Sequence, residues 1–425
     1  MDVNQTRERA VIVGLQLNQM KDDFFYSSLK ELENLADTAG ADVVATLTQK
    51  RQRADTVTYI GKGKVEELKA AIEELNPDLI LFDGELSPIQ QRNLENILDI
   101  KIIDRTTLIL DIFAMRARSR EGILQVELAR LQYKLPRLTG KGQELSRQGG
   151  GIGSRGAGEQ KLELDRRHIR RRIEEIQNHL KEVKRTRELH RKQREKTGIP
   201  SVSLVGYTNA GKSTLFNALF KQLNNETEEQ VEAENKLFKT LDTTTRKMIL
   251  PNGWEFLLTD TVGFIQNLPH KLVDAFRSTL EEALHSDLLL HVIDSSSDDC
   301  DEQMRTVEKV LKDLGVLEQP VLKVYNKSDL LPSVPTLERE AVFASGVSGY
   351  GVDSLVSRLE SELFSHSKTY HFFLPYQQAG IMSKFHRVGE VLETEEQEDG
   401  WKLSVRLTDE DYGRMRQEVE EYVIQ

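Results

Sequence analysis

The sequence predicts an α/β protein of several domains, and three observations support this prediction. The apolar segment VSLVG runs into the pattern Gly206-x-x-x-x-Gly211-Lys212-Ser213 and then into TLFNALF, as a strand, phosphate-binding loop and helix would. Residues 10–104 alternate short apolar runs with amphipathic stretches, which is typical of a small unit around a largely parallel sheet. At 425 residues, the chain is long enough for about three domains with separate cores.

In the N-terminal unit, we expect strands over AVIVGLQL, VVATLTQ, VTYIG, DLILFDG and KIID, and helices over VEELKAAIEEL and SPIQQRNLENIL. The segment Gly61-Lys62-Gly63-Lys64 lies between a predicted strand and a predicted helix. It forms either a tight turn that carries lysines or a phosphate or RNA contact at a helix N-terminus.

Two long helical patterns follow. Residues 106–135 and 159–196 carry apolar side chains at steps of three and four, and a single connection joins them, so an antiparallel hairpin is predicted. The connection, LTGKGQELSRQGGGIGSRGAGEQ, is rich in glycine and carries Lys141, Arg147 and Arg155. It is either a flexible tether or a loop that folds inside an RNA cavity.

Charge is distributed unevenly along the chain. The net charge is −11, yet residues 101–196 hold 25 Lys and Arg against 13 Asp and Glu. Many of the basic residues lie in the second helical pattern, namely Arg166, Arg167, Arg170, Arg171, Arg172, Lys181, Lys184, Arg185, Arg187, Arg191, Lys192 and Arg194. Such a run is either a solvated helix face or a contact for nucleic-acid phosphates. Because Tyr133 stands almost alone as an aromatic residue there, structured RNA is favoured over stacked single strands.

The phosphate-binding loop predicts a nucleoside triphosphate as ligand. Glycines allow backbone N–H groups to turn toward the β-phosphate, Lys212 reaches the β and γ oxygens, and the Ser213 hydroxyl is a ligand for Mg²⁺. After WEFLL, the segment Asp260-Thr261-Val262-Gly263 offers a carboxylate for the Mg²⁺ shell and a glycine amide for the γ-phosphate. The expected loop contacts are Gly206, Tyr207, Thr208, Asn209, Ala210, Gly211, Lys212, Ser213 and Thr214.

Two later motifs predict that the base is guanine. In VLKVYNKSDL, the residues Asn326, Lys327 and Asp329 follow an apolar strand, where a carboxylate accepts from both N1–H and the N2 amino group. Adenine lacks this pair of donors, and a site built on such pairing rejects the wrong analogue by roughly 10⁴-fold. In FASGVSGYGVDSL, backbone N–H groups in Ser345-Gly346-Val347 suit guanine O6.

The segments YIGKGKVEEL, LSPIQQRNLE, LSRQGGGIGSRGAGEQKLELDRR and LFKTLDTTTR, together with DTVGFI, resemble the HflX family of ribosome-associated GTPases. The resemblance implies an N-terminal α/β subdomain (1–105), a helical hairpin (106–197) with a glycine-rich loop (138–158), a P-loop GTPase domain (198–367) and a small C-terminal α/β domain (368–425). It further implies binding to the large ribosomal subunit and its RNA, with splitting or rescue of stalled ribosomes. The alternatives are a role in large-subunit assembly and a nucleotide-dependent RNA-binding adaptor with negligible hydrolysis.

By the same resemblance, the first switch segment falls on residues 238–242. Phe238, Thr240 and Asp242 are then expected near the nucleotide, and Thr240 becomes the second Mg²⁺ ligand beside Ser213 and Asp260. Thr243, Thr244 and Thr245 compete for that role. The expected catalytic residues are Lys212, Thr240 and Gly263.

Two positions bear on turnover. Phe264 stands where many GTPases place a glutamine that orients the attacking water, so slow intrinsic hydrolysis is predicted. Asn209 either holds a K⁺ ion near the phosphates, as in cation-dependent relatives, or makes a plain hydrogen bond within the loop.

The remaining segments predict little chemistry. HFFL and KLSVRL suit strands with a helix between them, and no catalytic set follows. One cysteine, Cys300, excludes a disulfide framework. Because no leader pattern and no run of 18 apolar residues occurs, we expect a cytoplasmic protein without a membrane span. We also expect a monomer.

Overall fold

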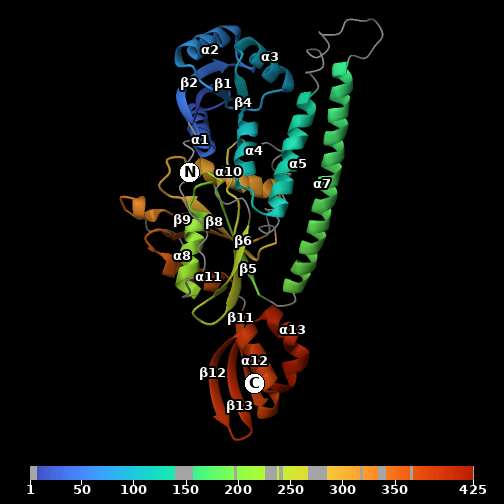
Figure 1. The fold of residues 1–425 in the computed structure, drawn as a ribbon. Coiled ribbons are helices and arrows are strands. Elements are labelled where there is room, and N and C mark those ends of the chain that lie inside the picture. The colour runs from blue at the N-terminus through green and yellow to red at the C-terminus, as the bar shows by residue number, and fades with distance from the viewer. Residues whose placement is uncertain are drawn as a thin grey trace, which may run out of the picture. The chain divides into compact units, whose positions relative to one another are not determined.

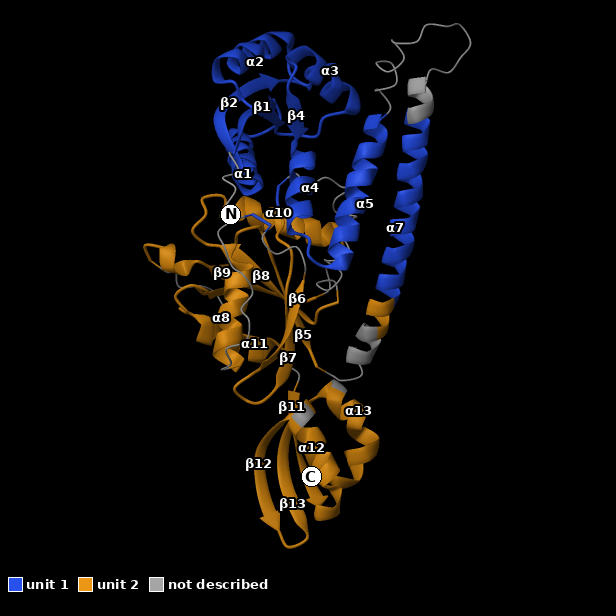
Figure 2. Ribbon diagram, viewed as in Figure 1, with its two compact units in different colours: residues 1–185, 235–242, 265–278 blue, residues 186–234, 243–264, 279–425 orange. Residues whose placement is uncertain are grey.

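The computed structural model describes residues 7–138, 157–195, 199–224, 237–238, 243–266, 285–315, 319–333, 341–363 and 367–424. Contacts divide the chain into two compact units (Figure 2): residues 1–185, 235–242 and 265–278 form the first, and residues 186–234, 243–264 and 279–425 form the second. Three sheets with flanking helices confirm the predicted α/β class. The four predicted domain boundaries stay a prediction.

The first unit contains a wholly parallel sheet in the order β2-β1-β3-β4. Apolar residues of α2 and α3 pack in one core with the sheet, where Phe82 and Leu94 are fully buried. Helix α1 contacts β1 and β2 and also packs against α4. The bounds are β1 Glu8–Leu17, α1 Asp22–Ala39, β2 Ala41–Arg51, α2 Lys62–Leu75, β3 Leu79–Phe82, α3 Pro88–Leu98 and β4 Lys101–Asp104.

The strand predicted over VTYIG is wrong. A carboxylate oxygen of Asp55 accepts from the backbone N–H of Val57 at 2.9 Å, and the Asp55 and Tyr59 backbones exchange two hydrogen bonds. Aspartate favours turns because its side chain bonds to nearby backbone in this way. Helix α2 then starts at Lys62 with Gly61 as its N-cap, so the glycine and lysine segment forms the first turn of a helix.

The helical pattern predicted over residues 106–135 is two helices, α4 Arg105–Arg116 and α5 Arg120–Arg137. Ala117 is extended, and the Ser119 side chain accepts from the backbone N–H of Gly122 at 2.9 Å, which caps a new helix. Helix α7 spans Ala157–Glu195 and lies antiparallel beside α5 (Figure 1). The predicted hairpin is therefore present, whereas residues 139–156 of its glycine-rich loop lie outside the described residues.

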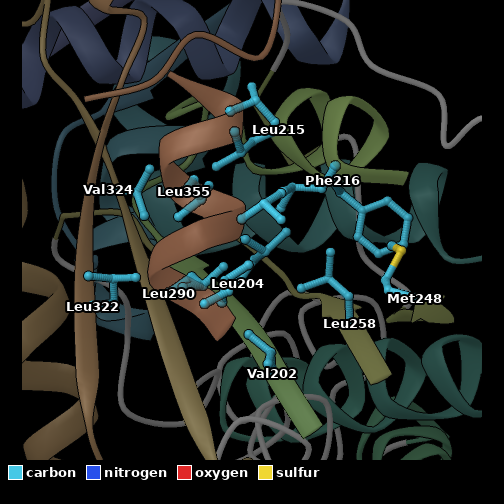
Figure 3. Close-up of a cluster of buried hydrophobic side chains, with 14 of the residues drawn as sticks. Val202, Leu204, Leu215, Phe216, Met248, Leu258, Leu290, Leu322, Val324 and Leu355 are labelled. Atoms are coloured by element: carbon cyan, nitrogen blue, oxygen red, sulfur yellow. The ribbon is translucent and has the colours of Figure 1, made fainter. Parts of the chain in front are cut away.

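The second unit contains a six-stranded sheet in the order β10-β9-β8-β5-β7-β6, parallel except for the edge strand β6. Figure 3 shows the core on one face, where Leu215 and Phe216 of α8 and Leu355 of α11 meet strand residues. The bounds are β5 Ser201–Gly206, α8 Lys212–Asn224, β6 Thr244–Ile249, β7 Glu255–Asp260, β8 Leu288–Asp294, α10 Cys300–Asp313, β9 Val321–Asn326, η2 Ser328–Leu330, β10 Ala341–Phe343 and α11 Val352–Leu363.

The C-terminal segment of the second unit forms an antiparallel sheet in the order β12-β13-β11-β14. Its buried residues, such as Phe372 and Val405, share one core with Phe385 of α12 and Val419 of α13. The strands predicted over HFFL and KLSVRL are confirmed as parts of β11 and β13. The bounds are β11 Ser367–Pro375, η3 Tyr376–Gln378, α12 Ala379–Val388, β12 Glu390–Gln397, β13 Gly400–Thr408, α13 Asp409–Val419, η4 Glu420–Tyr422 and β14 Val423–Ile424.

None of the helices in the described part of the chain combines the length and the apolar composition that a membrane span requires.

Candidate nucleotide-binding site

The sequence motifs of the second unit meet at the carboxyl edge of its sheet. Gly206 ends β5, Asp260 ends β7 in register with Leu204, and Asn326 ends β9. In open α/β sheets, ligands bind outside the carboxyl ends of the strands, where the chain connections diverge to either side. The fold therefore brings the predicted phosphate, metal and base residues of this unit to one edge.

The phosphate-binding loop folds around the ammonium group of Lys212. This group donates to the backbone carbonyl oxygens of Gly206 at 3.1 Å and Tyr207 at 2.9 Å, and the residue is only 7% exposed. Burial lowers the pKa of Lys212 to about 8, while the charge of Asp260 acts in the opposite direction. A phosphate that entered the loop would meet a cation already held at its centre.

We expect nucleotide binding to take up a proton above about pH 8, because phosphate charges favour the ammonium form of Lys212 and raise its pKa in the complex. The affinity for GDP should be constant well below pH 8 and fall by up to about tenfold per pH unit above it. Titration calorimetry at about pH 7 and pH 9, in buffers of different ionisation enthalpy, measures both effects. Equal affinity at both pH values, without proton uptake, would contradict the account of Lys212.

Ser213 and Asp260 are the candidate metal ligands that the structure describes. The Ser213 hydroxyl donates to Asp260 Oδ2 at 2.6 Å, so two oxygen donors lie together beside the loop. Mg²⁺ prefers oxygen ligands and usually takes only one or two protein carboxylates beside substrate phosphates and water. The pair fits that ion, and the described residues contain no cluster of three or more His, Cys, Asp or Glu suited to a metal. Thr240 and Asp242 lie outside the described residues.

Gly263 and Phe264 pass directly against the phosphate-binding loop. A Cβ atom at position 263 would stand 2.6 Å from Thr208 Cα, so only glycine fits there. The Phe264 N–H donates to the Gly206 carbonyl at 3.1 Å, and the Phe264 carbonyl accepts from the Thr208 N–H at 2.7 Å. The Phe264 side chain is 2% exposed. It offers no polar atom to a water molecule at the γ-phosphate.

Asn326 joins the phosphate-binding loop to the segment 345–347. Its amide nitrogen donates to the Ala210 carbonyl at 2.8 Å, and its amide oxygen accepts from the Gly346 N–H at 3.1 Å. A Cβ atom at position 346 would lie 2.8 Å from the backbone nitrogen of Leu215. This close approach favours glycine at position 346. The two predicted base motifs are thus held to one loop.

The other residues predicted to contact the base differ in their exposure to solvent. Asp329 is exposed within η2, Ser345 is fully buried and accepts from the Ser348 N–H at 3.1 Å, and Val347 is 81% exposed. Asn209 is exposed and adopts a left-handed backbone conformation, with φ of 60°. The K⁺ site at Asn209 stays a prediction.

Phe238, predicted near the nucleotide, belongs to the first unit. It is 2% exposed, and its ring meets that of Phe113 on α4 edge to face, with centroids 4.5 Å apart. The side chain is therefore committed to an apolar contact. Its role beside a nucleotide stays a prediction.

Sequence inspection missed Asp294, which ends β8. Its carboxylate pairs with the ammonium group of Lys327 at 2.6 Å. The sequence does carry a signal, because the apolar strand LLLHVID ends in an aspartate and is followed by three serines.

Three family models match consecutive parts of the chain. The model described as GTP-binding GTPase N-terminal matches residues 26–114, and the one described as GTP-binding GTPase Middle Region matches residues 116–194. The model described as 50S ribosome-binding GTPase matches residues 201–327.

Curated relatives match over nearly the whole length. GTPase HflX of Caldanaerobacter subterraneus subsp. tengcongensis is 49% identical over 98% of this chain and 94% of the relative. GTPase HflX of Escherichia coli K12 is 41% identical over 96% of this chain and 95% of the relative. A solved structure of a GTP-binding protein from Sulfolobus solfataricus with GDP is 24% identical over 84% of this chain and 98% of that one, with a TM-score of 0.42.

Proposed function

Because the chain belongs to the HflX family of GTPases, we propose that it binds the large ribosomal subunit, hydrolyses GTP to GDP and phosphate, and splits or rescues stalled ribosomes in the cytoplasm. Membership makes the chain a P-loop GTPase, which confirms the predicted fold and activity. The ribosomal partner is supported by the match to a 50S ribosome-binding family model and, above all, by the arginine-rich surface of α7.

In the proposed reaction, water attacks the γ-phosphorus in line, the bond to the bridging β–γ oxygen breaks, and GDP and phosphate leave. Lys212 and the backbone N–H groups of the loop hold the phosphate oxygens, and the Gly263 amide lies beside them. A Mg²⁺ ion held by Ser213 and Asp260, with Thr240 as the further expected ligand, would neutralise charge on the β and γ oxygens. Stabilisation of charge and position accounts for most of the catalysis in such sites.

For the base, we propose that Asp329 accepts from guanine N1–H and N2, and that the backbone around Ser345, Gly346 and Val347 donates to O6. The structural support is the bridge through Asn326, because it joins the segment 345–347 to the phosphate-binding loop. A nucleotide that fills the loop is then presented to both base motifs.

The surface proposed for ribosomal RNA is the exposed side of α7. Ile176 is buried and Ile169 and Ile173 are partly buried. The exposed arginines of the same stretch are Arg167, Arg170, Arg171 and Arg172, while Arg166 is partly buried. Arg167 and Arg171 form exposed i,i+4 pairs with glutamates on the same helix, and such pairs contribute little in water. RNA phosphates can therefore replace those glutamates at small cost.

Arg172 differs from its neighbours. Its guanidinium donates to both carboxylate oxygens of Glu127 on α5, at 2.7 and 2.9 Å. This forked pair is strong for an exposed site. We therefore assign Arg172 to the hairpin itself and the arginines around it to RNA.

Replacing Arg166, Arg167, Arg170 and Arg171 by Gln should weaken binding to large ribosomal subunits and flatten its salt dependence. Each lost phosphate contact lowers the slope of log K against log salt by roughly 0.7 to 0.9. Co-sedimentation with large subunits over a salt series measures the slope. Arg172→Gln is the matched control and should leave the slope unchanged. Equal slopes for the wild type and the fourfold variant would remove α7 from the RNA surface.

A further inference from the structure

The residues at the end of β8 hold the segment that carries the proposed guanine contact. The Lys327 ammonium group donates to Asp294 Oδ2 at 2.6 Å. One residue on, Ser295 donates to the Asn326 carbonyl twice, from its backbone N–H at 3.0 Å and from its hydroxyl at 2.7 Å. Asp294 and Ser295 thus bind consecutive residues of the segment 326–329. Asp294 binds the side chain of Lys327, and Ser295 binds the backbone of Asn326.

The Asp294 carboxylate is itself fixed. Its second oxygen, Oδ1, accepts from the backbone N–H of Ser296 at 3.1 Å and from the Ser296 hydroxyl at 2.7 Å. The Asp294 and Lys327 side chains are only 16% and 23% exposed, so solvent screens the ion pair less than a surface pair. A carboxylate with three donors in place holds its lysine in one direction.

These contacts hold a part of the backbone that is strained. Lys327 has φ of 60°, in the left-handed region that residues with a Cβ atom seldom adopt. A strained conformation persists only when surrounding contacts enforce it. The conformation at position 327 directs the chain into η2, which carries Asp329. Because Asp329 is exposed, its orientation depends on the backbone before it.

We propose that Asp294 and Ser295 are positioning residues for guanine recognition. They hold the segment 326–329 in the conformation that presents the Asp329 carboxylate to both donors of guanine, and they do so without contacting the base. The inference rests on the proposed function, because it takes Asp329 as the acceptor for N1–H and N2.

The consequence is a loss of discrimination as well as affinity. Guanine offers two donors to Asp329, whereas hypoxanthine, which lacks the N2 amino group, offers one. A carboxylate held in one orientation gains from both donors. If the carboxylate can rotate away, binding weakens most for the guanine nucleotide, because guanine requires two simultaneous hydrogen bonds. General destabilisation of the second unit would weaken the binding of both nucleotides by the same factor.

The test compares the dissociation constants of GDP and inosine diphosphate for full-length variants. The wild type should prefer GDP by at least about tenfold. Asp294→Asn retains an oxygen for the Ser296 donors but loses the charge, and it should weaken GDP by about tenfold while weakening inosine diphosphate about threefold or less. Glu308→Gln is the control, because it removes the charge from a second acid–lysine pair, 3.1 Å from Lys323 on β9, the strand that precedes Lys327. It should change neither constant.

Two further variants keep the inference falsifiable if Asp294→Asn folds poorly. Ser295→Ala removes only the hydroxyl donor to the Asn326 carbonyl. Like Asp294→Asn, it should reduce the ratio by which the protein prefers GDP over inosine diphosphate. In a double-mutant cycle, Asp294→Asn should add little to Lys327→Met, because the carboxylate acts through the lysine. Additive losses would overturn that assignment.

The failures can be told apart. If the wild type binds GDP and inosine diphosphate equally, the assignment of Asp329 to guanine is wrong. If the wild type discriminates and Asp294→Asn and Ser295→Ala leave the ratio of the two constants unchanged, the base assignment stands and the positioning role is overturned.

Discussion

Asp329→Asn is expected to lower the affinity for GDP by roughly 10³-fold and to make xanthosine diphosphate the preferred ligand. The amide cannot accept from both guanine N1–H and N2, and its NH₂ group would face the N2 donor. In xanthine the C2 substituent is an oxygen, to which the same NH₂ group donates. Competition binding of both diphosphates to the wild type and the variant measures the exchange of preference.

The exchange of preference is sharper than a loss of binding, because a misfolded variant would bind neither nucleotide. Asp313→Asn, at the exposed C-terminal end of α10, removes the same charge from the same unit and should leave the preference for GDP intact. If Asp329→Asn binds GDP with unchanged affinity, the assignment of guanine recognition to η2 is wrong.

Large ribosomal subunits are expected to raise GTP turnover by about 10²-fold or more. The reason is Phe264, whose ring is 2% exposed and whose backbone is bound to the phosphate-binding loop, so it cannot orient the attacking water. The water must then be positioned by other groups, and a partner supplies them only when it is bound. Phosphate release under multiple-turnover conditions measures the effect.

The grouping of the residues proposed to bind phosphate could be predicted from sequence. Glycines, Lys212 and Ser213 occur at a fixed spacing because the loop has a single geometry, and Asp260 and Asn326 follow apolar strands of a parallel sheet. In such a sheet, all carboxyl ends share one edge, so motifs far apart in the chain meet there. The structure places those residues together as expected.

Contacts between elements could not be predicted in this way. Asp294 pairs with Lys327 only because β8 and β9 are neighbours in register, and no spacing in the sequence encodes that pair. The apolar pattern continues across the break between α4 and α5 and so does not indicate it. The break arises because Ala117 is extended and the Ser119 side chain caps the start of α5. The strand wrongly predicted over VTYIG has β-branched and aromatic residues, but the hydrogen bonds of Asp55 outweigh that propensity.

Several assignments stay predictions for a different reason. Thr240 and Asp242 lie outside the described residues, as does most of the glycine-rich loop. Phe238 is described, but its ring packs against Phe113, a contact that the charge and spacing of the switch segment did not suggest.

The most direct test of the account is GTP turnover with and without isolated large ribosomal subunits, measured for the wild type, for the fourfold α7 variant and for Arg172→Gln. The account predicts slow turnover alone for all three proteins. Added subunits should strongly stimulate GTP turnover by the wild type and by Arg172→Gln. The fourfold variant should need a higher subunit concentration for half-maximal stimulation, and that concentration should rise less steeply with salt than it does for the wild type. Equal wild-type turnover with and without large subunits, at subunit concentrations that saturate binding, would contradict the central claim.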